Sequence, residues 1–215
     1  ADTFFVGWLG TSATGAVGVV FPLMALIQAV GFFFGQGSGN YISRQLGAQH
    51  REEAERMAAT GFFSALAAGA VIMVIGLVCH TPLCRLLGAT DTILPYALDY
   101  MCIILVGAPW ITAALVLNNQ LRLQGNATYA MVGLVSGGVL NIALDPLFIF
   151  VFDMGIAGAA VATILSQFIS FCLLLLGVRL SGGIQIRLRL FSPSRKRFLA
   201  LAGGGVPSLC RQGLA

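Results

Sequence analysis

A single acidic residue interrupts a long apolar stretch of this 215-residue sequence. Asp145 is the only charged residue between Ala127 and Phe152, and Asn141 precedes it by four positions. A carboxylate in such a stretch costs a few kcal/mol if the segment lies inside a lipid bilayer. We therefore interpret Asp145 as a functional residue. The alternative is a buried acid that hydrogen bonds hold for structure alone.

The neighbours of Asp145 suggest what it does. Gly133, Gly137, Asn141 and Asp145 follow one another at intervals of four, so they lie roughly along one face of a helix. The glycines let another helix approach this face. Pro146 lacks an amide hydrogen and restricts the residue before it, which frees a backbone carbonyl close to the carboxylate. Carboxylate, amide and carbonyl oxygens together suit a hard cation or a transferred proton.

Other polar residues in apolar surroundings have two interpretations each. Asp2 lies in the outer part of a helix and is either a second site residue or a helix-end residue. Tyr100 either points its hydroxyl inward or belongs to an aromatic belt at the membrane interface, where we place the carboxylate of Asp99. Thr163 and Gln167, one turn apart, supply polar atoms, although a threonine in a membrane helix often bonds its own backbone.

The composition requires a bilayer as solvent. Charged residues make up 9% of the chain, against about 25% in a typical soluble domain, and hydrophobic residues make up 58%. The mean hydropathy is +0.91. These values predict an all-α membrane protein that crosses the bilayer several times. The sequence has no HExxH or GxSxG motif, no acidic cluster for phosphate chemistry and no CxxC pair, so we expect neither an enzyme nor a cofactor.

Five full spans are expected, after a helix end over residues 1–10. Their ranges are about 15–37 with an extension to 47, then 58–78, 96–117, 128–151 and 156–178. Residues 49–57 form a charged connection, and residues 80–95 an outer connection with breaks at Pro82 and Pro95. Both ends of the chain are predicted to lie within helices, so we expect it to be a piece of a longer protein.

The basic residues are distributed very unevenly between the two ends of the predicted spans. Ten of the twelve fall on one side, namely Arg44, Arg51, Arg56, Arg122, Arg179, Arg187, Arg189, Arg195, Lys196 and Arg197. Only Arg85 lies in an opposite connection, and Arg211 lies in the final helix. The positive-inside rule makes the first side cytoplasmic. The net charge of +4 is therefore a consequence of topology, and we expect no nucleic-acid partner.

Small residues also recur at helical spacing. Gly31, Gly35, Gly39, Ser43 and Gly47 form one such stripe, and Gly61, Ala65 and Gly69 form another. Stripes of this kind let membrane helices pack closely against one another. We expect both stripes to lie in helix contacts.

Several segments resemble the multidrug and toxic compound extrusion (MATE) family. They are "ADTFFVGWLG", "GNYISRQLGA", "LRLQGNATYAM" and, above all, "LNIALDPLFIF…MGIAGAAVATILSQ". The resemblance implies a twelve-helix, two-lobe transporter of the prokaryotic branch, multi-pass in the inner (plasma) membrane. Residues 1–197 would be most of the six-helix N-terminal lobe. Residues 198–215 would begin helix 7 of the C-terminal lobe, which belongs to the same polypeptide.

The resemblance also assigns roles to residues of this chain. Asp2, Asn141 and Asp145 match the cation-coupling positions, where H+ or Na+ would bind. Tyr100 and Thr163 match positions that complete the hydrogen-bond network, and Asn118 is similar to a substrate-cavity residue. The implied activity is antiport, in which the protein exports small cationic amphipathic compounds by alternating access. Protonation shared between Asp2 and Asp145, or Na+ entry, would let the first helix repack.

Two other functions stay open at this stage. A lipid-linked oligosaccharide flippase has the same fold, but it usually lines its cavity with Arg or Lys, and the apolar cores of the spans between residues 15 and 178 contain none. A non-transporting membrane scaffold is the alternative from another class. The pairing of Asn141 with Asp145 argues against it. The sequence does not distinguish H+ from Na+ and does not identify the exported compounds.

Overall fold

The computed structural model describes residues 2–214, and within this range the chain forms helices and no strand. Residues 1 and 215, the outer limits of the two expected regions, lie outside the described range. The elements are α1 (Asp2–Val6), η1 (Gly7–Leu9), α2 (Thr11–Gly47), α3 (Arg51–Val78), α4 (His80–Leu86), α5 (Leu94–Leu123), α6 (Ala127–Pro146), η2 (Leu147–Val151), α7 (Ile156–Leu180), η3 (Leu188–Leu190) and α8 (Arg195–Gly213).

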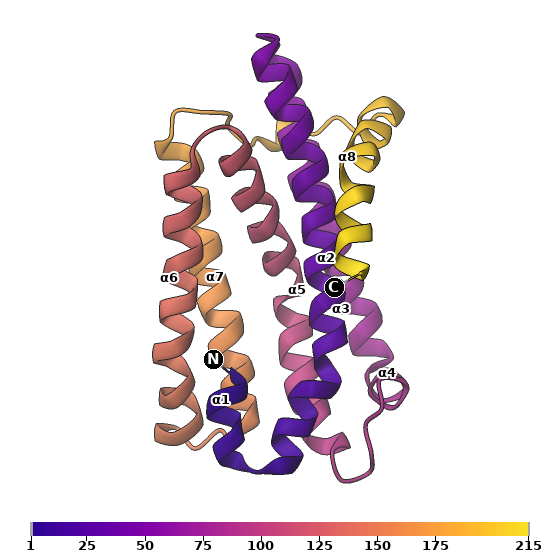
Figure 1. Cartoon of the computed structure of the whole chain (residues 1–215), viewed down its shortest axis with the longest axis vertical. Coiled ribbons are helices and arrows are strands. Elements are labelled where there is room, and N and C mark those ends of the chain that lie inside the picture. The colour runs from indigo at the N-terminus through magenta and orange to yellow at the C-terminus, as the bar shows by residue number, and fades with distance from the viewer. Residues whose placement is uncertain (1, 215) are drawn as a thin grey trace.

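Five helical segments are long and apolar enough to cross a membrane, which confirms the prediction of a multi-pass all-α membrane protein. They are α2, α3, α5, α6 with η2, and α7. Figure 1 shows them side by side in a bundle, with connections alternating between its two ends. The short α1 lies at the end opposite the tip that α2 and α3 form, and α8 runs along the outside of α2.

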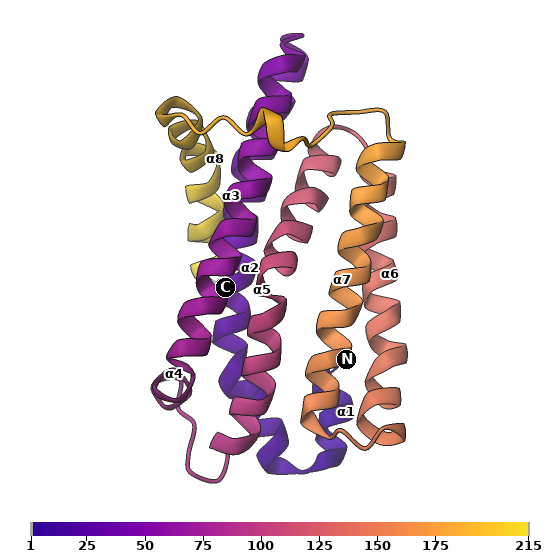
Figure 2. The ribbon, with the colours of Figure 1, turned by 180° about the vertical axis from the view of Figure 1, so that it is seen from behind.

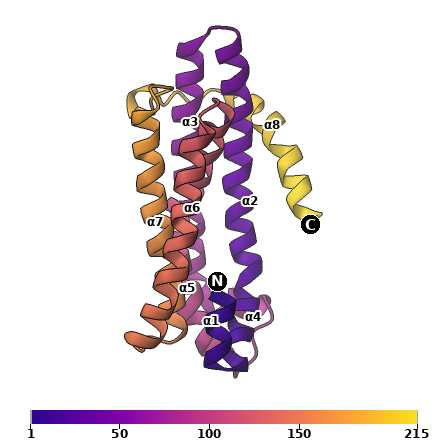
Figure 3. The same cartoon turned by 60° about the vertical axis from the view of Figure 1, so that its left-hand side comes forward.

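The prediction of a charged connection over residues 49–57 was wrong in its extent. Only Ala48–His50 connect α2 to α3, and the charged residues that follow form the first turns of α3. Ion pairs between residues four apart, Arg51 with Glu55 and Glu52 with Arg56, favour helix in this segment. As a result α2 and α3 extend together beyond the other helices (Figure 3).

The two prolines of the outer connection start helices instead of breaking them. Pro82 lies in the first turn of α4, and Pro95 is the second residue of α5. Proline is tolerated at these positions because the first amides of a helix have no partner within the helix. The two cysteines in and next to α4 are both free: Cys79 is exposed, and the buried Cys84 thiol contacts Met101 Sδ at 3.6 Å.

The central helix of the bundle is α5, which packs against α2, α3, α6 and α7. Its outer half carries Tyr100, Ile104 and Leu105, all within the largest hydrophobic cluster. By contrast, α6 lies at the edge and exposes most of its side chains, as expected for a helix that faces lipid. Figure 2 shows from behind how α7 lies between α6 and the centre.

The glycine stripe of α2 makes the predicted close contacts over part of its length. A methyl group at Gly31, Gly35 or Gly39 would overlap Leu115, Asn119 or Leu123 of α5. The stripe fails as a prediction at Ser43, which is exposed, and at Gly47, which has no neighbour within 4 Å of the position of a Cβ atom. These two positions lie where α2 extends past the end of α5, so the helix that contacts the rest of the stripe does not reach them.

The second stripe generates a testable prediction about packing. A Cβ atom at Gly69 in α3 would lie 2.7 Å from Pro109 Cα and 2.9 Å from the Ala108 carbonyl oxygen in α5. Gly69→Ala should therefore push two backbones apart and cost about 1–3 kcal/mol of stability. Thermal unfolding of the detergent-solubilised protein measures this loss. Gly18→Ala is the control, because no heavy atom lies within 4 Å there. Equal midpoints for the two variants would contradict the packing.

Candidate functional site

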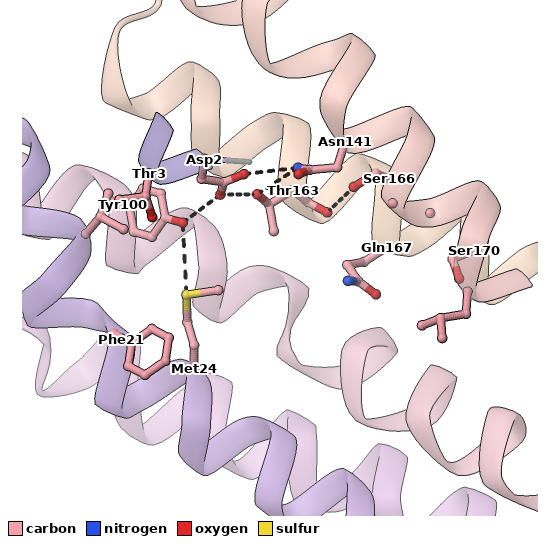
Figure 4. Close-up of a pocket in the computed structure, with 14 residues that line it drawn as sticks. Asp2, Thr3, Phe21, Met24, Tyr100, Asn141, Thr163, Ser166, Gln167 and Ser170 are labelled. Carbon is pink, nitrogen blue, oxygen red and sulfur yellow. Dashed lines mark hydrogen bonds between the residues drawn. The ribbon is translucent and has the colours of Figure 1, made fainter. Parts of the chain in front are cut away.

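Three neutral donors from three different helices surround the carboxylate of Asp2. Tyr100 of α5 donates its hydroxyl to Oδ2 at 2.8 Å, and the Thr163 hydroxyl of α7 donates to the same oxygen. Asn141 Nδ2 of α6 donates to Oδ1 at 3.1 Å. Figure 4 shows these side chains converging on Asp2. The sequence left Asp2 and Tyr100 with two interpretations each, and the structure places both in the interior cluster.

Asn141 joins Asp2 to the second acid. Its Nδ2 also lies 3.4 Å from Asp145 Oδ1 and 3.3 Å from Thr163 Oγ1. Asp145 is completely buried, and its Oδ2 has no hydrogen-bond partner among residues 2–214. The two carboxyl groups are thus linked through one amide, and the inner one has an acceptor oxygen with nothing to satisfy it. Such an atom is costly to bury, which favours a bound proton or cation at Asp145.

An irregular turn follows Asp145 and Pro146 directly. After Pro146 the helix changes to the π form over Leu147–Val151, where the Phe152 amide donates to the Leu147 carbonyl five residues earlier. Turns of this kind occur often at functional sites. Gly158 of α7 fits directly against this turn, because a Cβ there would lie 2.7 Å from the Phe148 carbonyl. The predicted loosening of the backbone after Asp145 is therefore present as a π turn.

The face of α6 that carries the site packs against α7, as the four-residue spacing predicts. A Cβ at Gly133 would overlap Leu174, and one at Gly137 would press on Ser170. The Ser170 hydroxyl donates to the Gly133 carbonyl at 2.7 Å and joins the two helices. This close approach brings Asn141 within reach of Thr163.

A cavity of about 350 Å³ opens beside the cluster. One wall is polar and includes Asp2, Tyr100, Asn141 and Thr163, while Phe21 and Met24 of α2 and Leu134 of α6 contribute apolar surface. Ser166, Gln167 and Ser170 continue the polar wall along α7, and Figure 4 shows Gln167 below Thr163. The two serines were not identified from the sequence, although their spacing from Thr163 at three and seven residues places them on the same helix face.

A second space of about 40 Å³ adjoins the first between α2, α5 and α7. It shares Met24, Thr163 and Gln167 with the larger cavity and adds Gln28. Gln28 was not identified from the sequence. The sequence gives one indication of Gln28, which is that an amide side chain interrupts an apolar run at this position.

Two polar residues considered in the sequence analysis lie away from this cavity. Asn118 of α5 donates its amide to the Ala130 carbonyl of α6 at 2.9 Å and does not line either space. Its role as a substrate-cavity residue stays a prediction. Asp99 is exposed and lies in a surface groove with His80 and Cys102, as expected for an interfacial carboxylate.

The electrostatics of the cluster favour a positively charged or protonated occupant. The ion pairs among residues 2–214 lie near helix ends and include neither Asp2 nor Asp145. No Lys or Arg lines either space within that range. Negative charge in a low-dielectric interior attracts a cation strongly. The described residues contain no group of three or more His, Cys, Asp or Glu that could hold a metal ion, and the cluster itself offers carboxylate, amide and hydroxyl groups.

Sequence comparisons identify relatives that are about twice as long as this chain. The MatE family model matches residues 1–147. The multidrug export protein MepA of Staphylococcus aureus is 26% identical over 209 residues, and MepA of Staphylococcus saprophyticus is 28% identical. Each alignment covers 96% of this chain and 46% of the relative. The chain therefore spans about half the length of the curated relatives it matches.

Solved structures share the fold of this half. A multidrug resistance MATE family transporter of the MOP superfamily, in its inward-facing conformation, superposes with a TM-score of 0.93 at 34% identity. An outward-facing MATE transporter gives a TM-score of 0.90 at 35% identity. The superpositions cover 98% of this chain and 48% or 47% of the solved chains. The half-length bundle is thus the fold of one lobe of such a transporter.

The geometry of the cluster predicts a measurable coupling between Tyr100 and Asp2. Tyr100→Phe removes one of three donors to the carboxylate and should cost about 1–3 kcal/mol of unfolding free energy. In a double-mutant cycle with Asp2→Ala, the two losses should not add, because both remove the same hydrogen bond. Thermal unfolding in detergent measures each variant. Tyr129→Phe serves as the control, since that side chain is exposed. Additive losses would show that the two residues do not interact.

Proposed function

Because this chain belongs to the MatE family of multidrug and toxic compound extrusion transporters, we propose that the protein containing it is a cation-coupled antiporter for cationic, amphipathic compounds. The observation that carries the proposal is the cluster of Asp2, Asn141 and Asp145 beside a cavity in an apolar bundle. Acids inside membrane proteins usually mark ion pathways or proton relays. The MepA relatives are multidrug export proteins, which supports a role in drug export.

The donors available to Asp2 support proton coupling. Thr163 has one hydroxyl hydrogen, and its oxygen lies within reach of both the Asp2 carboxylate and the Ala159 carbonyl, at 3.0 Å from the latter. When Asp2 is ionised, the hydroxyl donates to it. When Asp2 is protonated, Thr163 turns its hydrogen to Ala159 and accepts from Asp2 instead. The network thus has a satisfied arrangement for each protonation state, which lets a proton enter and leave without stranding a buried group.

Na+ is the alternative coupling ion for the same residues. A flip of the Asn141 amide presents Oδ1 in place of Nδ2, and the carboxylates and the Thr163 hydroxyl add further oxygens. Hard cations prefer such oxygen sets. The ion would then replace the amide as the bridge between Asp2 and Asp145.

Coupling between ion and substrate arises because both use one cavity. An ionised cluster attracts a cationic compound, and a proton or Na+ at the cluster removes that attraction. Binding of one occupant therefore disfavours the other, as antiport requires. The apolar wall of Phe21, Met24 and Leu134 would hold the hydrophobic part of the compound.

Alternating access would use this bundle as one rigid lobe moving against a second. Its high similarity to both an inward-facing and an outward-facing relative supports rigid-body motion of the lobe. In this proposal the protein lies in the inner (plasma) membrane with its basic end in the cytoplasm, and the C-terminal lobe is the partner surface. Asn118, near the cytoplasmic end of α5, belongs to the substrate path.

The flippase alternative is less well supported by the cavity. A pyrophosphate-linked substrate needs basic side chains, whereas the described lining carries acid, amide and hydroxyl groups. Such a wall would repel a polyanion.

The central experiment uses the intact transporter in proteoliposomes. Export of a fluorescent cationic dye should be driven by an imposed pH gradient or by a Na+ gradient, and the effective gradient identifies the ion. Asp145→Asn should abolish coupled export, because the amide cannot gain or lose a proton and binds a cation weakly. Asp99→Asn is the matched control, since that carboxyl is exposed outside the cavity. Undiminished gradient-driven export by Asp145→Asn would refute the proposal.

A further inference from the structure

The connection between α7 and α8, residues 181–194, crosses the end of the bundle that carries most of the basic residues (Figure 2). Hydrogen bonds attach its backbone to two helices. The Ile184 amide donates to Gln124 Oε1 at the end of α5 at 3.4 Å, and the Ser192 amide donates to the Thr60 hydroxyl of α3 at 3.3 Å. The connection therefore has a fixed place on the surface of the bundle.

These attachments put the connection at the level where three of the spanning helices end. Gln124 directly follows α5, α6 begins at Ala127, and α7 ends at Leu180 on the same side. Thr60, by contrast, lies nine residues after the start of α3, so α3 continues about 14 Å past this level. The shared end of three spans marks the headgroup region of a bilayer. The connection thus lies at the membrane interface.

Most of the basic side chains over residues 179–197 are exposed. These are Arg179, Arg187, Arg189, Arg195 and Lys196. The remaining one, Arg197, is buried and donates its Nε and Nη2 to the two carboxylate oxygens of Glu53 at 3.1 and 3.2 Å. Residues 179–197 include no acid, and the ion pairs within residues 2–214 involve none of the five exposed cations. Their charge is therefore available to a partner outside the described chain.

Apolar side chains emerge among these cations. Leu188 follows one arginine, precedes another, and is 69% exposed. Phe191 is also exposed on one side, while its ring packs edge-on against Phe63 of α3. Ile184, in contrast, is buried in the cluster with side chains of α2 and α3. An exposed leucine between two arginines suits a surface that is anionic at the top and apolar beneath.

The location of these groups argues against other partners. The five exposed cations line neither of the two cavities beside Asp2, so they have no place in the proposed ion and substrate site. They follow an extended connection, which suits a broad anionic surface better than one small anion. A nucleic acid or an acidic peptide would match their charge and leave Leu188 in water. The positive-inside rule explains the sign of the charge at this end but not the exposed leucine.

We propose that residues 187–196, together with Arg179, form a binding surface for anionic lipid headgroups in the leaflet at this end of the bundle. The basic side chains contact the headgroup phosphates, and Leu188 and Phe191 enter the acyl region beneath them. Arginine suits this role because its planar guanidinium donates two parallel hydrogen bonds to phosphate oxygens. This surface depends only on the membrane fold, so it stands apart from the proposed antiport.

Hydrogen–deuterium exchange of the intact protein in lipid nanodiscs tests the surface directly. The amides of residues 187–191 should exchange about fivefold more slowly in phosphatidylcholine discs that contain about one third phosphatidylglycerol than in pure phosphatidylcholine discs, because each cation near an anionic surface contributes about fivefold in affinity. Equal exchange in the two kinds of disc overturns the proposal, whether the connection is free or covered by the second lobe.

Variants show whether these particular side chains cause the difference. Arg187→Gln with Arg189→Gln should remove most of it, and Leu188→Ser should reduce it without a change in charge. The matched control is Arg44→Gln with Arg56→Gln, which removes the same charge from the α2 and α3 extension at the same end and should keep the difference. An equal loss in the control would show that net charge alone acts, and would overturn the proposed surface.

Thermal unfolding separates a lipid from a free phosphate as the ligand. In a neutral detergent, short-chain phosphatidylglycerol should raise the unfolding midpoint of the intact protein by about 2 °C or more, because it binds the folded state. Short-chain phosphatidylcholine and glycerol 3-phosphate at the same concentration should not. An equal rise with glycerol 3-phosphate would indicate a site for soluble anions and would overturn the lipid surface.

Discussion

The rest of the structure depends on keeping two carboxyl groups inside an apolar bundle without a basic partner. Asp2 is stabilised by hydrogen bonds from a phenol, a hydroxyl and an amide, each supplied by a different helix. None of these donors carries charge, so the proposed coupling ion would bring the first positive charge to the cluster. An Arg or Lys side chain beside the two carboxyl groups would have formed a permanent ion pair with them. The absence of one from the described lining leaves the negative charge for an exchangeable partner.

Each helix contact near the cluster serves its geometry. The glycines of α6 bring Asn141 against α7, and Gly158 lets α7 pack on the π turn that follows Asp145. The central α5 presents Tyr100 to the opposite side of Asp2. At the other end of the bundle, α2 carries Tyr41, whose hydroxyl donates to Glu53 of α3 beside Arg197 of α8.

Sequence reasoning found the parts of the site that carry an energetic anomaly. Asp145 was identified because an isolated acid in a bilayer segment needs compensation, and Asn141 because it lies one turn away on the same face. Asp2 and Thr163 acquired roles only through family resemblance, since a helix-end acid and a self-bonded threonine are ordinary. Ser166 and Ser170 were missed because serine in a membrane helix commonly bonds its own backbone. The hydrophobicity pattern could not locate the π turn, because the residues of the turn are as apolar as those around it.

The ion pair of Glu53 and Arg197 could not be predicted from the sequence, for a different reason. Glu53 and Arg197 are separated by 144 positions, and each lies in a charged segment that topology already explains.

The most direct test of the central claim follows proton release from the purified intact transporter in weakly buffered detergent. Addition of Na+ or a cationic dye should release protons from the wild type and none from the variant carrying both Asp2→Asn and Asp145→Asn. Equal release from the two proteins would contradict the account, because the exchangeable cation would then bind elsewhere.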